Sequence, residues 1–159
     1  MRPVIVDAHS DLLHDVYRLR KEGKRRVIEQ HYLNDVRASG INVLICSLFV
    51  PDSCLPESAL RYALTQIGTL HREIEESPGQ FELCRRAGEV KSAVEAGKIA
   101  LLLSFEGVEP IGNDLLLLYD PSDHAQLITQ QCSFLEVQIL RSFDHLFLDG
   151  FAQSLLPPL

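Results

Sequence analysis

The sequence has little sulfur and few aromatic side chains: it contains no tryptophan, one methionine and four cysteines, and 7% of its residues are aromatic. No two cysteines form a CxxC pair, which argues against a zinc knuckle, and four are too few for a disulfide scaffold. One of them, Cys46, falls in a segment expected to be a buried strand. We therefore expect reduced thiols and a cytoplasmic protein.

Long hydrophobic runs are also missing. The apolar residues 4–6 are interrupted at once by Asp7, whereas a signal peptide needs an apolar region of about 7–15 residues. The longest apolar runs, 99–103 and 115–119, fall well short of the ~18 residues of a membrane span. The sequence thus predicts neither a signal peptide nor a membrane-spanning segment.

Basic residues are also few compared with acidic ones. The chain carries 15 Lys+Arg against 22 Asp+Glu, a formal net charge of −7. Nucleic-acid binding rests on clustered Lys and Arg, so this balance argues against nucleic acid as a partner. The one basic run, Arg18–Arg26, is short and flanked by acids, and we interpret it as a solvated helix end.

What is present is an ordinary share of apolar residues, 46% of 159, arranged as alternating strand-like and helix-like segments. Apolar strands that alternate with amphipathic helices predict an α/β fold with a parallel sheet covered on both faces. The expected strands are 3–8, 41–50, 81–84 and 99–105, and the expected helices are 11–21, 32–39, 56–77, 88–96 and 114–119.

Hydrophobic spacing predicts which helix faces are buried. We expect Leu12, Val16 and Leu19 to face the core in the first helix, and Val90, Ala93 and Val94 in the helix 88–96. For the long helix, whose first turn suits Pro56, the expected inward residues are Leu60, Leu64, Ile67, Leu70 and Ile74. After Asp120 the pattern is lost, and we divide the chain into residues 1–120 and a divergent tail, 121–159.

The first candidate site is the stretch Asp7-Ala8-His9-Ser10-Asp11 at the end of the first expected strand. Strand side chains alternate between faces, so Asp7, His9 and Asp11 are expected to project to one side. An imidazole and a carboxylate so placed can hold a metal ion. The alternative is that Ser10 or Asp11 caps the following helix and His9 has no ligand.

The second candidate is Glu106, which directly follows the apolar strand 99–105. An unpaired carboxylate would be costly to bury there, and a cation would remove that cost. The alternative is a loop glutamate clear of the sheet. Because the carboxyl ends of parallel strands lie at one edge, we expect His9, Asp11 and Glu106 to converge, as ligands that suit zinc or manganese.

Three segments, in this order, resemble the membrane (renal-type) dipeptidase family over about residues 3–120. The first is 4–12, with a D-[GA]-H-x-D-L pattern; the second is 34–42 followed by 47–51; the third is 97–107, ending in Glu-Gly, followed by 112–115. The resemblance implies a binuclear zinc peptidase on a TIM-type (βα) barrel. His9 and Asp11 would bind one zinc, Glu106 would bridge both, and a metal-bridging hydroxide would hydrolyse a dipeptide substrate.

The resemblance ends near Asp120. The family's G-V-R-type strand start and T-[HW]-N-type strand end do not follow, and we interpret His124 and His145 as surface histidines. The catalytic residues are therefore unassigned. A complete barrel needs about 250 residues, so we expect the first half of a barrel, whose open strand edges would favour a homo-oligomer.

Three hypotheses remain open. The chain is the N-terminal portion of a zinc dipeptidase, holds at most one metal ion weakly, and has reduced or no activity. Alternatively, it is a non-catalytic frameshift or truncation product that only oligomerises or associates with another fragment. A third reading is a metal-dependent hydrolase of cyclic amides or phosphoesters, but that would need a further HxH or carboxylated lysine, and Lys98 precedes its strand.

Overall fold

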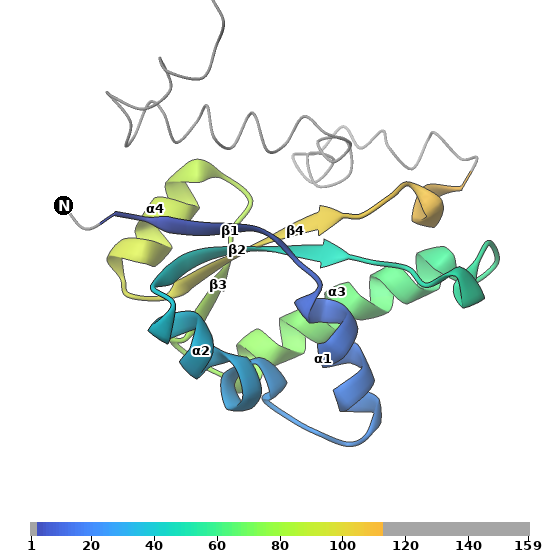
Figure 1. Ribbon diagram of the computed structural model, residues 1–159, viewed down its shortest axis with the longest axis horizontal. Coiled ribbons are helices and arrows are strands. Elements are labelled where there is room, and N and C mark those ends of the chain that lie inside the picture. The colour runs from blue at the N-terminus through green and yellow to red at the C-terminus, as the bar shows by residue number, and fades with distance from the viewer. Residues whose placement is uncertain (1–2, 113–159) are drawn as a thin grey trace, which may run out of the picture.

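The computed structural model describes residues 3–112. Each strand of this part is followed by at least one helical segment, as the alternation in the sequence predicts (Figure 1). In chain order the elements are β1 (Ile5–Ser10), α1 (Leu12–Lys21), the π-helix η1 (Ile28–Tyr32), α2 (Leu33–Ala38), β2 (Ile41–Leu48), the 3-10 turn η2 (Asp52–Cys54), α3 (Ala59–Glu76), β3 (Phe81–Leu83), α4 (Ala87–Glu95), β4 (Ile99–Phe105) and the 3-10 turn η3 (Glu109–Ile111).

The four strands form one parallel sheet in the order β1-β2-β4-β3. The parallel α/β prediction is thus confirmed. β4 lies inside the sheet between β2 and β3, and its first five residues are buried. A strand covered on both faces reads as a continuous apolar run, which is why its bounds, Ile99–Phe105, match the sequence prediction.

Alternate residues of the strands feed two hydrophobic clusters, one on each face of the sheet. The larger cluster packs the sheet against α1, η1 and α3, and the smaller one packs it against α4. Figure 1 shows these helices on opposite sides of the strands. Toward α1 and α3 point Leu44, Cys46, Leu48, Leu101 and Leu103; toward α4 point Val43, Ile45, Ala100 and Leu102.

The predicted inward faces of α1 and α4 are confirmed. In α1, Leu12 and Val16 are buried and Leu19 packs against the larger cluster. In α4, Val90 and Ala93 are buried and Val94 packs against the smaller cluster. The periodicity succeeds here because the aliphatic side chains of these short helices are the ones that face the sheet.

The predicted face of α3 is wrong in its first half. Leu60 and Leu64 are 41% and 57% exposed. The buried residues of this half are Ala59, Ala63 and Gln66, and the two alanines pack with Val50 in a small cluster. Small side chains let the helix approach the end of β2 closely, and each leucine, one position further along, is turned away from that contact by about 100°.

Two further element predictions differ from the structure. Pro56 lies in a turn before α3, because the residue before a proline disfavours helical backbone and Leu55 is extended, with ψ 147°. The helix expected over 32–39 is preceded by the π-helix η1, whose Ile28 is fully buried.

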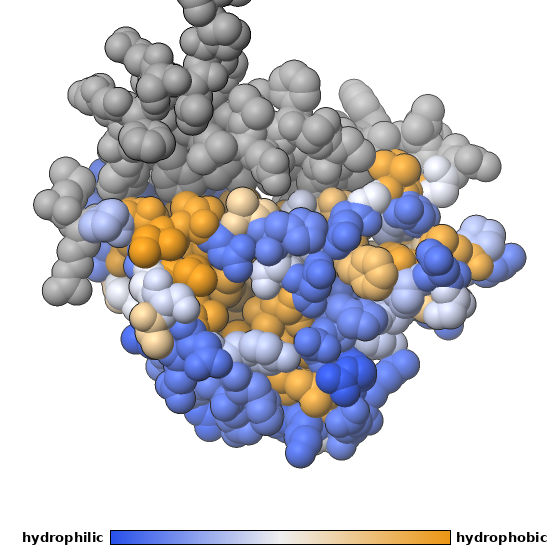
Figure 2. Space-filling view, viewed as in Figure 1, coloured by the Kyte–Doolittle hydropathy of each residue, from blue (hydrophilic) through white to orange (hydrophobic). Residues whose placement is uncertain are grey.

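β1 is not the buried strand that the sequence predicts. None of its residues is fully buried, and Ile5 is 42% exposed. β1 is exposed because it lies at an edge of the sheet, where it pairs with β2 alone among the described strands. Figure 2 shows hydrophobic side chains gathered where β1 and β2 run together, while hydrophilic ones cover much of α1 and α2.

A buried ionic network joins three helical segments. The Arg20 guanidinium from α1 contacts the carboxylates of Glu73 and Glu76 on α3, with Nη1 and Nη2 each 2.8 Å from an oxygen of Glu76. Glu73 is fully buried and also accepts the backbone N–H of Ile28 at 2.8 Å. The hydrogen bonds from Arg20 lower the pKa of Glu76 to about 2.

In the described range 3–112, no helix is both long and apolar enough to cross a membrane. The expected helix 114–119, the boundary at residue 120 and the tail 121–159, with Cys132, His124 and His145, lie outside the described residues.

Candidate metal centre

The strands bring three of the predicted ligands to one edge of the sheet. His9 is the penultimate residue of β1, Asp11 follows at the start of α1, and Glu106 directly follows β4. Asp11 occupies the N-cap position of α1, yet its side chain makes no capping hydrogen bond. The carboxylate is therefore available to a ligand, and the capping alternative does not describe this residue.

The three side chains lie within reach of one ion. His9 Nε2 is 3.4 Å from Asp11 Oδ1 and 3.4 Å from Glu106 Oε2. One nitrogen or oxygen from each residue lies within 4.8 Å of the other two. The side chains are 56%, 64% and 40% exposed, so an ion reaches them from solvent.

The strand between β1 and β4 contributes a further polar group. Ser47 of β2 is 1% exposed, and its hydroxyl lies 3.3 Å from Nδ1 and 3.4 Å from Nε2 of His9. The hydroxyl is thus in hydrogen-bonding contact with the imidazole and limits where the ring can lie. Sequence analysis missed this role, although a serine in an otherwise apolar strand was the available signal.

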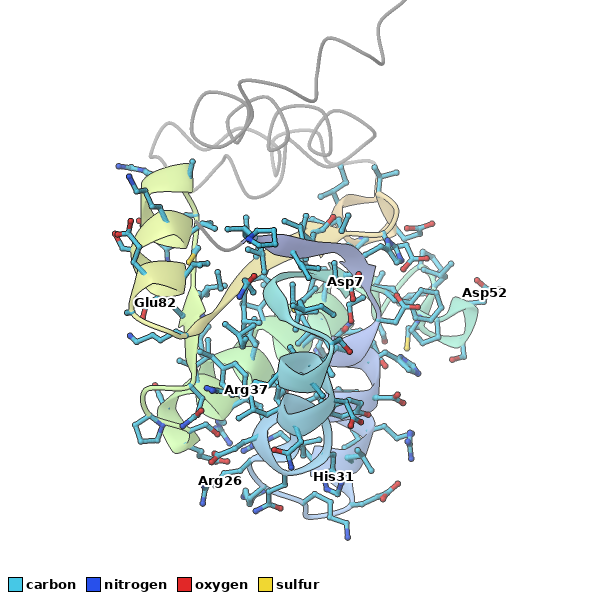
Figure 3. All side chains as sticks on the ribbon, turned by 60° about the vertical axis from the view of Figure 1, so that its left-hand side comes forward. Asp7, Arg26, His31, Arg37, Asp52 and Glu82 are labelled. Carbon is cyan, nitrogen blue, oxygen red and sulfur yellow. The ribbon has the colours of Figure 1, made fainter. Side chains whose placement is uncertain are left out.

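Asp7 does not join the cluster, in contrast to the expectation from strand alternation. Its Oδ1 accepts the backbone N–H of His9 at 3.2 Å. The pairing of β1 with β2 shifts register between Asp7 and Ser10, and an irregularity of this kind breaks the simple alternation of faces. The Asp7 carboxylate therefore binds the backbone of its own strand, and Figure 3 shows the position of Asp7 on β1.

The electrostatics of the cluster favour a bound cation. Partial burial and the negative charge of Asp11 raise the pKa of Glu106, and the nearby His9 opposes the rise. Two carboxylates and one imidazole form a donor set that suits a divalent ion such as zinc or manganese. The residues present therefore fit such an ion, which would relieve the repulsion between the two carboxylates.

A tight turn fixes the backbone just after Glu106. Gly107 has φ 103°, a conformation that side chains with a Cβ rarely adopt. A Cβ built at this position would lie 2.0 Å from Oε2 of Glu109. The positive φ is the reason for glycine here, because the Glu109 carboxylate is the far end of a flexible side chain that can move away from an added Cβ.

Aromatic residues pack beside the first turn of α1. The Tyr62 hydroxyl lies 3.0 Å from His14 Nδ1, and the His14 ring meets Phe49 edge-on at 5.5 Å between centroids. These contacts join the His14 ring of α1 to α3. The described cysteines are free, and burial raises the pKa of Cys46 to about 12.

Comparison with known proteins identifies the family. The family described as Membrane dipeptidase (Peptidase family M19) matches residues 1–126. The chain belongs to this dipeptidase family. The match includes all three members of the cluster as well as Ser47, so the M19 resemblance stated from the sequence is confirmed.

Individual members of the M19 family also match this chain in sequence and in structure. A curated relative, Dipeptidase ataJ from Aspergillus terreus (strain NIH 2624 / FGSC A1156), is 26% identical over 126 aligned residues, which cover 70% of this chain and 31% of the relative. The crystal structure of the dipeptidase AC, an M19 metallopeptidase, superposes with a TM-score of 0.61 at 26% identity, covering 70% of this chain and 37% of that one.

A second solved structure shows the same fold. It is a metallopeptidase from Rhodobacter sphaeroides liganded with a phosphinate mimic of the dipeptide L-Ala-D-Ala, with a TM-score of 0.59 at 23% identity, covering 70% of this chain and 40% of that one. The chain thus spans about a third of the length of the M19 proteins it matches.

Proposed function

We propose that residues 1–120 form the first half of a TIM-type M19 barrel and supply part of the zinc centre of a dipeptidase. The convergence of His9, Asp11 and Glu106 from two strands that are not adjacent carries this proposal. Family membership supports a metallopeptidase, and the dipeptide mimic on the Rhodobacter sphaeroides relative supports a dipeptide as the substrate.

In this proposal each residue has a distinct task. His9 and Asp11 would hold one zinc ion, and Glu106 would supply the carboxylate that this ion shares with a second one. Bound zinc would polarise the peptide carbonyl and lower the pKa of a water molecule. The chain's own contribution is to hold three ligands in fixed positions, with Ser47 orienting the His9 ring and the Gly107 turn aiming Glu106.

The 159-residue chain by itself is expected to have an incomplete metal centre. The described residues offer one cluster of metal ligands with three members, and the aligned part of the chain covers 31% and 37% of two matched relatives. We therefore expect weak binding of one ion and little or no dipeptide hydrolysis by the 159-residue chain. The edge position of β1 supports pairing with another copy, and the free thiols support a cytoplasmic setting.

Zinc binding tests the site directly. Replacing Asp11 with asparagine, or Glu106 with glutamine, is expected to weaken zinc affinity more than about 100-fold, since loss of a residue that merely orients a ligand already costs 10–100-fold. The measurement is competition with a chromogenic chelator on the purified 159-residue chain. Asp35→Asn is the matched control, because Asp35 is an exposed aspartate on α2, and it should bind zinc like the wild type.

Two outcomes contradict the proposal. Equal zinc affinity in the wild type and the Asp11 and Glu106 variants would show that the cluster is not the metal site. Robust hydrolysis of a dipeptide such as L-Ala-D-Ala by the 159-residue chain would overturn the expected lack of activity, and would show that the chain completes its own catalytic centre.

Ser47 gives a second test of the same geometry. Ser47→Ala is expected to weaken zinc affinity about 10-fold by freeing the His9 ring. Ser104→Ala is the control, because Ser104 pairs with Ser47 across β2 and β4 and makes no described hydrogen bond to His9. Equal affinities in the two variants, measured by the same competition, would remove Ser47 from this positioning role.

A further inference from the structure

The basic run Arg18–Arg26 is not explained by the metal centre. It leads from the end of α1 toward η1, and Figure 3 shows its last residue, Arg26, at the end of the molecule away from Asp7 on β1. The interpretation as a solvated helix end predicts cations that point separately into water. The structure instead collects several of them around one hollow.

The hollow lies between α1 and α3 and encloses about 490 Å³. Four of its eight lining residues are cationic and none is acidic, although the chain as a whole carries a net charge of −7. The cationic residues are Arg20, Lys21 and Arg25 from the basic run and Arg72 from α3. A concave surface lined by one sign of charge raises the local concentration of the opposite ion.

Ion pairs elsewhere in the basic run show which cations are already neutralised. Arg18 pairs with Glu22 and with Asp15, and Arg26 pairs with Glu29 at 2.6 Å. Neither arginine lines the hollow. The side chains that form surface pairs are therefore distinct from those that turn toward the hollow.

In the part of the chain that the structure describes, the cations of the hollow other than Arg20 have no such ion-pair partner. Within residues 3–112, Lys21, Arg25 and Arg72 form no ion pair with a carboxylate. The Lys21 ammonium lies 4.6 Å from the centre of the Tyr17 ring, and Arg25 Nη1 donates to the backbone carbonyl of Lys24 at 3.2 Å. Neither contact involves a carboxylate, although Arg25 lies near enough to Glu76 to help lower the pKa of that carboxylate.

The walls of the hollow are preformed. Arg20 is fixed by Glu73 and Glu76, so it gives the hollow a rigid floor rather than a free charge. Gly68 leaves the α3 wall open, because a Cβ there would meet nothing within 4 Å. The carboxylates of Glu73 and Glu76 are already engaged by Arg20, and Glu76 also accepts the Arg26 N–H.

We propose that this hollow binds a small phosphate-bearing polyanion between α1 and α3, with Lys21, Arg25 and Arg72 as its charged contacts. Arginine donates paired hydrogen bonds to phosphate oxygens, and lysine adds a point charge. The volume exceeds that of a single phosphate and lies within the 300–1,000 Å³ range of small-molecule sites. The site is separate from the His9–Asp11–Glu106 cluster and shares no residue with it.

Calorimetric titration with pyrophosphate tests the proposal. The probe is added to the metal-free 159-residue chain at low ionic strength, because pyrophosphate itself binds metal ions. We expect a Kd below about 1 mM, with weaker binding at about 150 mM salt. Lys21→Gln and Arg72→Gln should each weaken binding at least about fivefold, and inorganic phosphate should bind less tightly than pyrophosphate.

Arg61→Gln is the matched control, because Arg61 is exposed on the same helix, α3, and does not line the hollow. It should change the Kd less than about twofold. Equal weakening by Arg61→Gln and Arg72→Gln would show diffuse attraction and overturn the site. Absence of pyrophosphate binding to the wild-type chain would overturn it as well.

Discussion

Replacement of Arg20 by methionine is expected to lower the free energy of unfolding by about 3–5 kcal/mol, the cost of breaking a buried ion pair by removing one partner. The side chains of Arg20 and Glu73 are 9% and 0% exposed. Without the guanidinium, Glu73 keeps the Ile28 N–H but must bury its charge or take up a proton. Urea unfolding at neutral pH, followed by circular dichroism, measures the change.

Arg18→Met supplies the control two residues away on the same helix. Arg18 is 55% exposed, and its partners Asp15 and Glu22 are about half exposed. Surface pairs of this kind contribute up to about 1 kcal/mol, so this variant should stay close to the wild type. If the two variants lose the same stability, the Arg20 network is not the structural link that its burial indicates.

The same network predicts how stability depends on pH. The pKa of Glu76 is about 2 in the folded chain, below its ordinary value of 4.5. A lowered folded-state pKa contributes stability that is complete above the unfolded value and is lost as pH falls through the folded one. The difference in unfolding free energy between wild type and Glu76→Gln should therefore shrink between about pH 4.5 and pH 2. A constant difference across this range would contradict the assignment.

The second large effect is expected in the core. Leu70→Ala should destabilise the fold by about 3–5 kcal/mol, because a fully buried leucine is replaced by a cavity. Leu70 is 0% exposed and belongs to the cluster that joins α3 to the sheet. Thermal and urea unfolding of the purified variant give the value.

Leu64→Ala is the matched comparison, since it makes the same chemical change on the same helix at a site that is 57% exposed. Its expected effect is within about 0.5 kcal/mol. A loss near that of Leu70→Ala would mean that Leu64 is covered in solution, as the hydrophobic periodicity of the sequence predicted.

The sequence predicts those parts of the fold in which burial and hydrophobicity coincide. β4 has the predicted bounds because both of its faces are covered, and the rule that parallel strands end at one edge brought His9 and Glu106 together. The exposed Leu64 shows where this reasoning fails. The first half of α3 packs closely against the end of β2, and the small Ala59 and Ala63 make this contact. Hydrophobic periodicity instead predicts that the larger leucines face the core, because it ranks residues by hydrophobicity and ignores how closely two elements approach.

Register and strand order were equally beyond prediction. The pairing of β1 with β2 is irregular after Asp7, and the Asp7 carboxylate accepts the backbone N–H of His9 instead of joining the cluster. The local sequence does not reveal this irregularity, because strand register depends on the partner strand. Likewise, the position of β3 outside β4 follows from tertiary packing. Ser47 appeared as one more residue of an apolar strand until the structure placed the His9 ring against it.

The strand order β1-β2-β4-β3 has a consequence for the chain as it leaves the ribosome. β1, β2 and β3 are synthesised before β4, yet β4 is the strand that joins β2 to β3. Until residues 99–105 emerge, β2 has one unpaired edge and β3 has no described partner, and such edges invite wrong pairing. Glu106 directly follows β4, so the metal-ligand cluster is completed by the same stretch of chain that closes the sheet.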